Sequence, residues 1–159
     1  MTTIPRRVLV VSTREDRDNV TSALSRWAID PVCCSSVSEV CALLPNACPS
    51  IIFCEETLAD GTYRELLREL SKSTKTRLVV ISRAADCEDT YNEAITLGAF
   101  DMIASPCRRS DVQWLAIRAM QDQVRRCASR RHSKLVAESL GSNPEPSETA
   151  ASKGASQGR

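Results

Sequence analysis

The stretch that decides the fold is Pro49-Ser-Ile-Ile-Phe-Cys-Glu-Glu-Thr-Leu-Ala-Asp-Gly61. Its apolar run, residues 51–54, is too short for a typical helix and is rich in β-branched and aromatic residues, which is typical of a buried strand. The run ends abruptly on Glu55, and turn residues follow it. Because open parallel sheets place their sites beyond the carboxyl ends of their strands, this pattern predicts a carboxylate where such a site would lie.

Similar short apolar runs recur along the chain, and each is followed by a segment with helical spacing. The other runs cover residues 7–12, 31–34, 77–82 and 101–105. Ser36 with Glu39 and Thr62 with Glu65 match the capping-box pattern of helix starts, and Gly98 is typical of a helix end. Strands that alternate with helices imply a parallel sheet with helices on both faces. We therefore predict a single α/β domain, a flavodoxin-like (βα)5 doubly wound sheet with strand order 2-1-3-4-5.

The composition of the 159 residues is that of a soluble globular protein, with 26% charged and 42% apolar residues. Aromatic residues make up 4%, so the core has to be built from Val, Ile, Leu and Ala, which suits a layered α/β fold. The net charge of +1 predicts neither nucleic-acid nor membrane binding from global electrostatics. Since the sequence shows neither a membrane-length apolar run nor a signal-peptide pattern, we expect a cytoplasmic protein.

Eight cysteines are spread along the chain, and in the cytoplasm such thiols stay reduced. The sequence has no C-x-x-C pair and a single histidine, His132, so no zinc pattern is visible. We expect the cysteines to serve as small apolar side chains. The alternative is thiol-based sensing by Cys54 and Cys107, which the fold would bring near one crevice, although strand alternation turns Cys54 away from the side to which Glu55 points.

The character of the sequence changes near residue 126. Five cations gather between Arg125 and Lys134, after which Ser, Pro, Gly, Ala and Glu dominate. We assign residues 1–126 to the folded domain and residues 127–159 to a basic, then Ser/Ala/Pro-rich tail that we expect to be mostly disordered. The basic cluster has no neighbouring aromatic residues for base stacking, and cations are favoured at a helix C-terminus in any case. Nucleic-acid binding through this cluster is therefore an alternative function and not the first hypothesis.

The predicted crevice collects polar side chains from several strand ends. They are Ser12, Thr13, Glu55, Glu56, Ser82 and Ser105. This set offers no nucleophile paired with a base and no group of oxygen ligands suited to a metal. The sequence also lacks a Gly-rich phosphate loop, a nucleophile elbow and any Cys/His pairing, so we expect no enzymatic activity.

Four segments of the chain match a family pattern: residues 7–11, 49–61, 78–82 and 93–106. The last is the most specific, because Glu93-Ala-Ile-Thr-Leu-Gly-Ala-Phe-Asp-Met-Ile-Ala-Ser-Pro106 is similar to the stretch Ala-x-x-x-Gly-Ala-x-Asp-Tyr-Leu-x-Lys-Pro. Over residues 5–126 the sequence resembles the response-regulator receiver domain, the CheY-like module of two-component phosphorelay signalling. The resemblance implies the fold predicted above and a stand-alone signalling protein that acts through protein–protein interaction.

The resemblance also implies a role for each pocket position. In the family, two acids after the first strand hold Mg²⁺, and Ser12 and Thr13 stand there in this chain. The phospho-accepting Asp falls on Glu55, the Thr or Ser that contacts the phosphoryl group on Ser82, and the Lys before the Pro on Ser105. Phosphoryl transfer depends on charge neutralisation by a metal and a cation. We therefore expect an atypical receiver, or pseudo-receiver, with no cofactor, no Mg²⁺ and no phosphorylation at Glu55.

Two acids near the pocket, Glu15 and Asp16, are interpreted as partners of the helix dipole.

The family's interaction face, formed by the fourth helix, the fifth strand and the fifth helix, would carry Tyr91, Met102, Val112, Trp114 and Arg118, with Met102 at the family's switch position. The resemblance implies a protein partner there: a histidine kinase, another receiver, an effector or a second copy of this chain. Roughly 30 tail residues cannot form a DNA-reading module, so output is expected to pass through such a partner.

Overall fold

The computed structural model describes residues 8–12, 14–72 and 75–141. The chain divides into two compact units, Met1–Arg125 and Arg126–Arg159. The first unit contains every strand of the described residues and the candidate pocket, whereas the described part of the second unit is the end of one helix.

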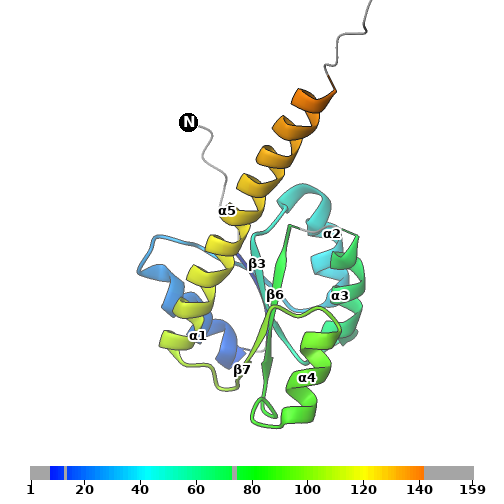
Figure 1. Ribbon diagram of the computed structural model, residues 1–159. Coiled ribbons are helices and arrows are strands. Elements are labelled where there is room, and N and C mark those ends of the chain that lie inside the picture. The colour runs from blue at the N-terminus through cyan, green and yellow to red at the C-terminus, as the bar shows by residue number, and fades with distance from the viewer. Residues whose placement is uncertain (1–7, 13, 73–74, 142–159) are drawn as a thin grey trace, which may run out of the picture. The chain divides into compact units, whose positions relative to one another are not determined.

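A five-stranded parallel sheet forms the centre of the first unit, in the order β2-β1-β3-β6-β7 (Figure 1). Its members, in that order, are Val32–Cys34, Val8–Val11, Ile51–Glu55, Arg77–Ser82 and Asp101–Ala104. Counted along the βα units, this is the order 2-1-3-4-5, so the predicted fold class is confirmed. The winding reverses between β1 and β3, which pair in parallel along the full length of β1.

The helices of the described chain cover both faces of the sheet. They are α1 (Arg14–Ser25), α2 (Val37–Ala47), α3 (Tyr63–Ser71), α4 (Glu88–Thr96) and α5 (Arg109–Leu140). Figure 1 shows α1 and the first part of α5 on one face, and α2, α3 and α4 on the other.

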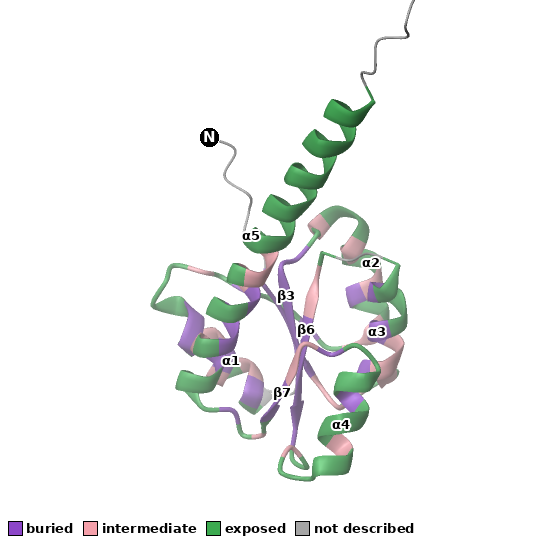
Figure 2. Ribbon diagram, in the orientation of Figure 1, coloured by how far each residue is buried: buried purple, intermediate pink, exposed green. Residues whose placement is uncertain are grey.

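Strand alternation divides the core into two clusters, one on each face of the sheet. Val10 and Phe53 pack with buried side chains of α1 and α5, whereas Val11 and Cys54 pack with those of α2, α3 and α4. Both faces are covered, which explains why the strands read as continuous apolar runs (Figure 2).

A short antiparallel hairpin follows β3, where the sequence predicted only turn residues. It consists of β4 (Thr57–Leu58) and β5 (Gly61–Thr62). Thr62 then forms the predicted capping box with Glu65 at the start of α3, and Gly98 adopts the predicted positive φ, 108°. The hairpin therefore leads the chain directly from the pocket edge into α3.

Helix α5 corrects the expectation for the tail. It continues to Leu140, so residues 127–140 of the segment that we expected to be mostly disordered are helical. Pro and Gly are absent from residues 107–140, and Arg, Lys, Ala and Leu are good helix formers. Residues 126–140 are exposed throughout, and residues 142–159 lie outside the described residues. Within the described ranges, no helix has both the length and the apolar character that a membrane span requires.

Candidate functional site

A pocket of about 300 Å³ lies at the carboxyl-terminal edge of the sheet. Its lining comes from four strand-to-helix connections: Glu15, Asp16, Glu55, Glu56, Thr57, Ile81, Ser82, Arg83 and Ser105. This is the edge at which open parallel sheets bind ligands. The structure thus brings Glu55, Ser82 and Ser105 together, while Thr13 lies outside the described residues. Four carboxylates and one cation, Arg83, line the pocket, so its charge is predominantly negative.

The carboxylate of Glu55, at the end of β3, is bonded to the neighbouring strand β1. The Ser12 hydroxyl donates a hydrogen bond of 3.0 Å to Glu55 Oε1. Ser12 is itself buried, and its backbone carbonyl accepts a hydrogen bond of 3.1 Å from the Arg17 guanidinium. The Glu55 carboxylate is therefore directed across the sheet toward β1.

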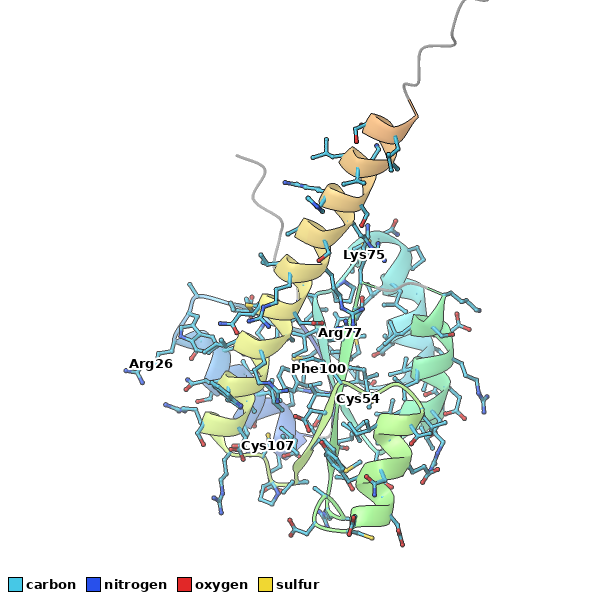
Figure 3. The ribbon with its side chains drawn as sticks, in the orientation of Figure 1. Arg26, Cys54, Lys75, Arg77, Phe100 and Cys107 are labelled. Atoms are coloured by element: carbon cyan, nitrogen blue, oxygen red, sulfur yellow. The ribbon has the colours of Figure 1, made fainter. Side chains whose placement is uncertain are left out.

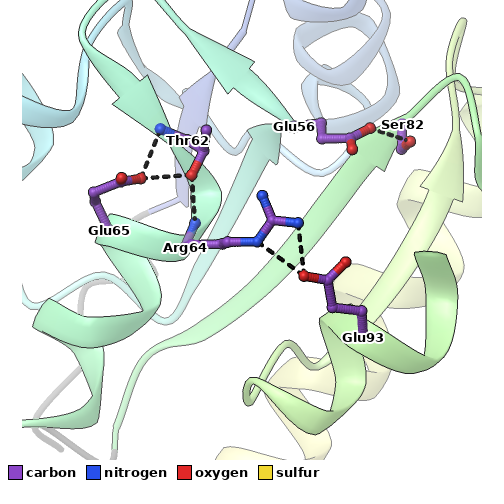
Figure 4. A network of polar contacts seen from close by, with 6 residues as sticks. All are labelled: Glu56, Thr62, Arg64, Glu65, Ser82 and Glu93. Carbon is purple, nitrogen blue, oxygen red and sulfur yellow. Dashed lines mark hydrogen bonds and ion pairs between the residues drawn. The ribbon is translucent and has the colours of Figure 1, made fainter. Parts of the chain in front are cut away.

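The next residue, Glu56, is bonded in the opposite direction, to β6. The Ser82 hydroxyl donates a hydrogen bond of 2.6 Å to Glu56 Oε2 (Figure 4). The same hydroxyl oxygen accepts a bond of 3.0 Å from the backbone N–H of Ala84. Sequence reasoning assigned Ser82 to the pocket but gave no special role to Glu56, because only the register of β3 against β6 reveals which acid reaches that serine.

A third serine–carboxylate pair joins α1 to the connection between β7 and α5. The Ser105 hydroxyl donates a bond of 2.6 Å to Asp16 Oδ2, and the backbone N–H of Cys107 donates one of 2.9 Å to Asp16 Oδ1. Asp16 is only 2% exposed. Its interpretation as a partner of the helix dipole was incomplete, because its side chain binds the end of β7. The available signal was that the first turn of α1 and the end of β7 must share one edge of a parallel sheet.

These pairs limit what the pocket can do chemically. Hydrogen bonds to a carboxylate are stronger than neutral ones, so the serines hold the acids firmly. Mg²⁺ requires near-octahedral oxygen ligands at about 2.0–2.1 Å, and the hydrogen bonds of Asp16 direct its carboxylate at Ser105 and Cys107. Among the described residues, no three or more His, Cys, Asp or Glu side chains are arranged to hold a metal ion. The donor set is a poor fit for Mg²⁺.

The two cysteines of the sensing alternative do not share a crevice. Cys54 belongs to the core cluster on the α2–α4 face and Cys107 to the cluster on the α1–α5 face (Figure 3), so their expected proximity is wrong. Burial raises the pKa of the Cys54 thiol far above its ordinary value, and the charge of Glu55 raises it further. Burial, with a further contribution from Asp16, raises the pKa of Cys107 to about 12. The thiolate is the reactive form, so neither position favours peroxide sensing.

The predicted interaction face is exposed only in part. Tyr91, Trp114 and Arg118 are exposed, and Trp114 is the most exposed of them at 61%. Met102 and Val112 are buried, which corrects their assignment to the surface. Met102 points from β7 toward the α2–α4 cluster, and Val112 lies on the side of α5 that packs on the sheet.

Asp101, which the sequence did not single out, connects the exposed residues of this face. Arg118 forms an ion pair of 3.1 Å with Asp101 Oδ2, and the Tyr91 hydroxyl donates a bond of 3.4 Å to Asp101 Oδ1. The charge of Asp101 raises the pKa of Tyr91. The Arg118 guanidinium also lies 5.5 Å from the centre of the Phe100 ring. The side chains of α4, β7 and α5 are therefore linked across this face.

Comparison with known proteins identifies the fold. No protein-family model and no curated protein match the sequence. The activated receiver-domain dimer of NtrC4 matches with a TM-score of 0.67 and 19% identity, over 74% of this chain and 98% of that one. The CheY-like receiver protein of Methanospirillum hungatei JF-1 matches with a TM-score of 0.65 and 17% identity, over 76% of this chain and 98% of that one. The adenylate cyclase structure from Rhodopirellula baltica matches with a TM-score of 0.70 and 17% identity, over 82% of this chain and 98% of that one. The chain therefore has the fold of the response-regulator receiver, or CheY-like, domain.

Proposed function

We propose that this chain is a receiver-like signalling module of a two-component system that works through protein–protein contact without phosphorylation at Glu55. The fold supports the signalling role, because the solved structures that resemble it include response-regulator receivers. The pocket supports the absence of phosphorylation, because Glu55, Glu56 and Asp16 are bonded to serine hydroxyls.

The bond between Ser105 and Asp16 is the observation that carries this proposal. Ser105 stands where the resemblance places a lysine, and its hydroxyl donates to an acid instead of supplying a positive charge. Phosphoryl transfer needs the developing charge to be neutralised by cations. Among the described lining residues Arg83 is the only cation, so a phosphoryl group on Glu55 would stand among three further carboxylates.

The poor fit of the pocket to Mg²⁺ supports the same proposal. A receiver that used Mg²⁺ would need several carboxylate oxygens directed at one point. Here Asp16 is directed at the β7 end, Glu55 at β1 and Glu56 at β6. The acids diverge, and we propose that Mg²⁺ has no part in this chain's activity.

We also propose that the chain is not an enzyme, although one structural neighbour bears the name of adenylate cyclase. In the described part of the pocket lining, the Ser82 and Ser105 hydroxyls are bonded to the carboxylates of Glu56 and Asp16, and no histidine or lysine is present. The arrangement holds the strand ends together.

The output surface we propose is formed by α4, β7 and α5, with Tyr91, Trp114 and Arg118 as its exposed members. Its partner would be a histidine kinase, another receiver, an effector or a second copy of this chain. The dimeric NtrC4 receiver supports the last possibility by analogy. An exposed Trp is also a typical anchor of protein interfaces.

Intact-protein mass spectrometry after incubation with acetyl phosphate and Mg²⁺ tests the proposal. We expect an unchanged mass. A stoichiometric phosphate adduct that disappears in Glu55→Ala would contradict it.

A further inference from the structure

The main chain of Ser82 is fixed by its two neighbouring strands. The backbone of β6 is held on both sides at this point, because the Glu56 N–H donates to the Ile81 carbonyl (3.1 Å) and the Ser105 N–H donates to the Ser82 carbonyl (3.0 Å). Ser82 is also 2% exposed. The main chain of Ser82 is therefore fixed, and its side chain is enclosed by the protein.

The Ser82 hydroxyl links Glu56 to the connection between β6 and α4. It donates to Glu56 Oε2 at 2.6 Å and accepts from the Ala84 N–H at 3.0 Å. A hydroxyl has one proton to donate. The acceptor of that proton decides how the oxygen is oriented toward Ala84.

Glu56 is well placed to be a permanent acceptor. Its N–H is bonded to β6, and its carbonyl accepts a bond of 3.3 Å from the N–H of Tyr63, the first residue of α3. The main chain of Glu56 is thus fixed between β6 and α3. Glu55, by contrast, accepts from Ser12 on the other side of β3.

From Ala84 the bonds continue into α4. The Ala84 carbonyl accepts from the N–H of Cys87 at 3.0 Å, and the Cys87 carbonyl accepts from the N–H of Tyr91 at 3.0 Å. Farther along α4, Glu93 forms an ion pair of 2.7 Å with Arg64 of α3 (Figure 4). The start of α4 therefore depends on a series of bonds that begins at Glu56.

We propose that Glu56 is the positioning residue that couples this pocket to α4, by holding the Ser82 hydroxyl without any added phosphoryl group. The inference rests on the proposed function, since it explains how a pocket that is not phosphorylated sets the state of the α4 surface. The acceptor oxygen, rather than the charge, is the feature that Ser82 requires.

Hydrogen–deuterium exchange of the purified chain tests this coupling without any phosphoryl donor. In Glu56→Ala we expect exchange in residues 83–96 to be about five- to tenfold faster than in the unmodified chain, because the Ser82 hydroxyl loses its acceptor. Glu56→Gln keeps a carbonyl oxygen that can accept the same bond, so its exchange should stay within about twofold of the unmodified chain. Glu55→Ala is the matched control and should leave residues 83–96 unchanged.

Two outcomes would overturn the inference. In the first, residues 83–96 exchange as fast in Glu55→Ala as in Glu56→Ala. In the second, they exchange as fast in Glu56→Gln as in Glu56→Ala. If Glu56→Ala does not fold, Ser82→Ala provides the second test, since it should expose the same residues 83–96 to exchange. The phosphate-adduct experiment is separate, so a chain that proves to be phosphorylated would overturn the proposed function while the exchange pattern still decides the role of Glu56.

Discussion

Asp60, in the turn between β4 and β5, caps the start of α2 through Ser38. Its carboxylate accepts bonds from the Ser38 hydroxyl (2.6 Å) and the Ser38 backbone N–H (3.0 Å), and also one of 2.7 Å from the N–H of Val37. The first N–H groups of a helix have no partner within the helix, so an acid from a distant loop can satisfy them. These hydrogen bonds connect the β4–β5 hairpin to the start of α2.

Replacement of Asp60 by alanine should lower the melting temperature by about 3–6 °C at pH 7, the usual effect of losing a helix cap in a domain of this size. A Ser36→Ala variant is the matched control, because Ser36 is the local cap of the same helix and accepts from the Glu39 N–H. Thermal unfolding by circular dichroism measures both. Equal melting temperatures for Asp60→Ala and the unmodified chain would contradict the capping role.

The contribution of Asp60 should also depend on pH. The Ser38 hydroxyl, followed by the N–H groups of Ser38 and Val37, lowers the pKa of Asp60 in the folded chain. A lowered folded-state pKa means that the stabilisation is fully present above the ordinary Asp value, near 3.9, and is lost as the pH falls through the folded-state value. The difference in melting temperature between the unmodified chain and Asp60→Ala should therefore shrink in acid below about pH 4. A difference that grows in acid would contradict this assignment.

Two ion pairs of the first unit should differ in their effect on stability. Arg77 of β6 (labelled in Figure 3) pairs with Asp122 of α5 at 2.6 Å, with side-chain exposures of 17% and 33%. Arg64 and Glu93 are more exposed. Asp122→Ala leaves a shielded guanidinium without this partner and should cost about 1–3 kcal/mol, whereas Glu93→Ala should cost about 0–1 kcal/mol. Urea unfolding measures both, and an equal or reversed order would contradict the structure.

The thiols should react in an order set by their surroundings. The polar groups of the first turn of α4, Thr90 foremost, lower the pKa of the exposed Cys87 thiol. Burial raises the pKa of Cys54 and Cys107. Since the thiolate is the nucleophile, iodoacetamide at pH 7 should label Cys87 well before either buried thiol. Peptide mass spectrometry gives the order, and labelling of Cys54 or Cys107 as fast as Cys87 would revive the sensing alternative.

If two copies associate through the α4–β7–α5 surface, Trp114 should be part of the contact. Its exposure means that Trp114→Glu should barely change stability, within about 0.5 kcal/mol, while it weakens association. Trp27 is also exposed but follows α1, so Trp27→Glu is the control. Sedimentation velocity should show a dimer that dissociates in Trp114→Glu and persists in Trp27→Glu. A dimer unaffected by Trp114→Glu would contradict this surface.

The strands and their order in the sheet could be predicted from the sequence, because the signals that mark each strand and helix are local. Apolar runs, the Thr62–Glu65 capping box and Gly98 each mark an element within a few residues, and right-handed crossovers then leave few arrangements. The two-residue strands β4 and β5 were missed because a period of two cannot be read from two residues. The folded domain was ended at residue 126 on composition, whereas helix propensity and the absence of Pro and Gly carry α5 on to Leu140.

The sequence predicted where the pocket lies but not which of its side chains are bonded to each other. Parallel strands must end at one edge, so Glu55, Ser82 and Ser105 could be gathered from the sequence. Which hydroxyl meets which carboxylate depends on register and on side-chain direction, and so the partners of Asp16 and Glu56 required the structure. Met102 and Val112 were placed on the surface because a family position does not specify whether a side chain is buried.

The most direct test of the central claim is the intact mass of the chain during incubation with acetyl phosphate and Mg²⁺, beside a receiver that is phosphorylated under the same conditions. Glu55→Asp is a useful companion, because it restores the shorter acid while Asp16 stays bonded to Ser105. The proposed mechanism predicts an unchanged mass for the chain and for Glu55→Asp, with an adduct only in the reference receiver. A stoichiometric phosphate adduct on the unmodified chain, lost in Glu55→Ala, would contradict it.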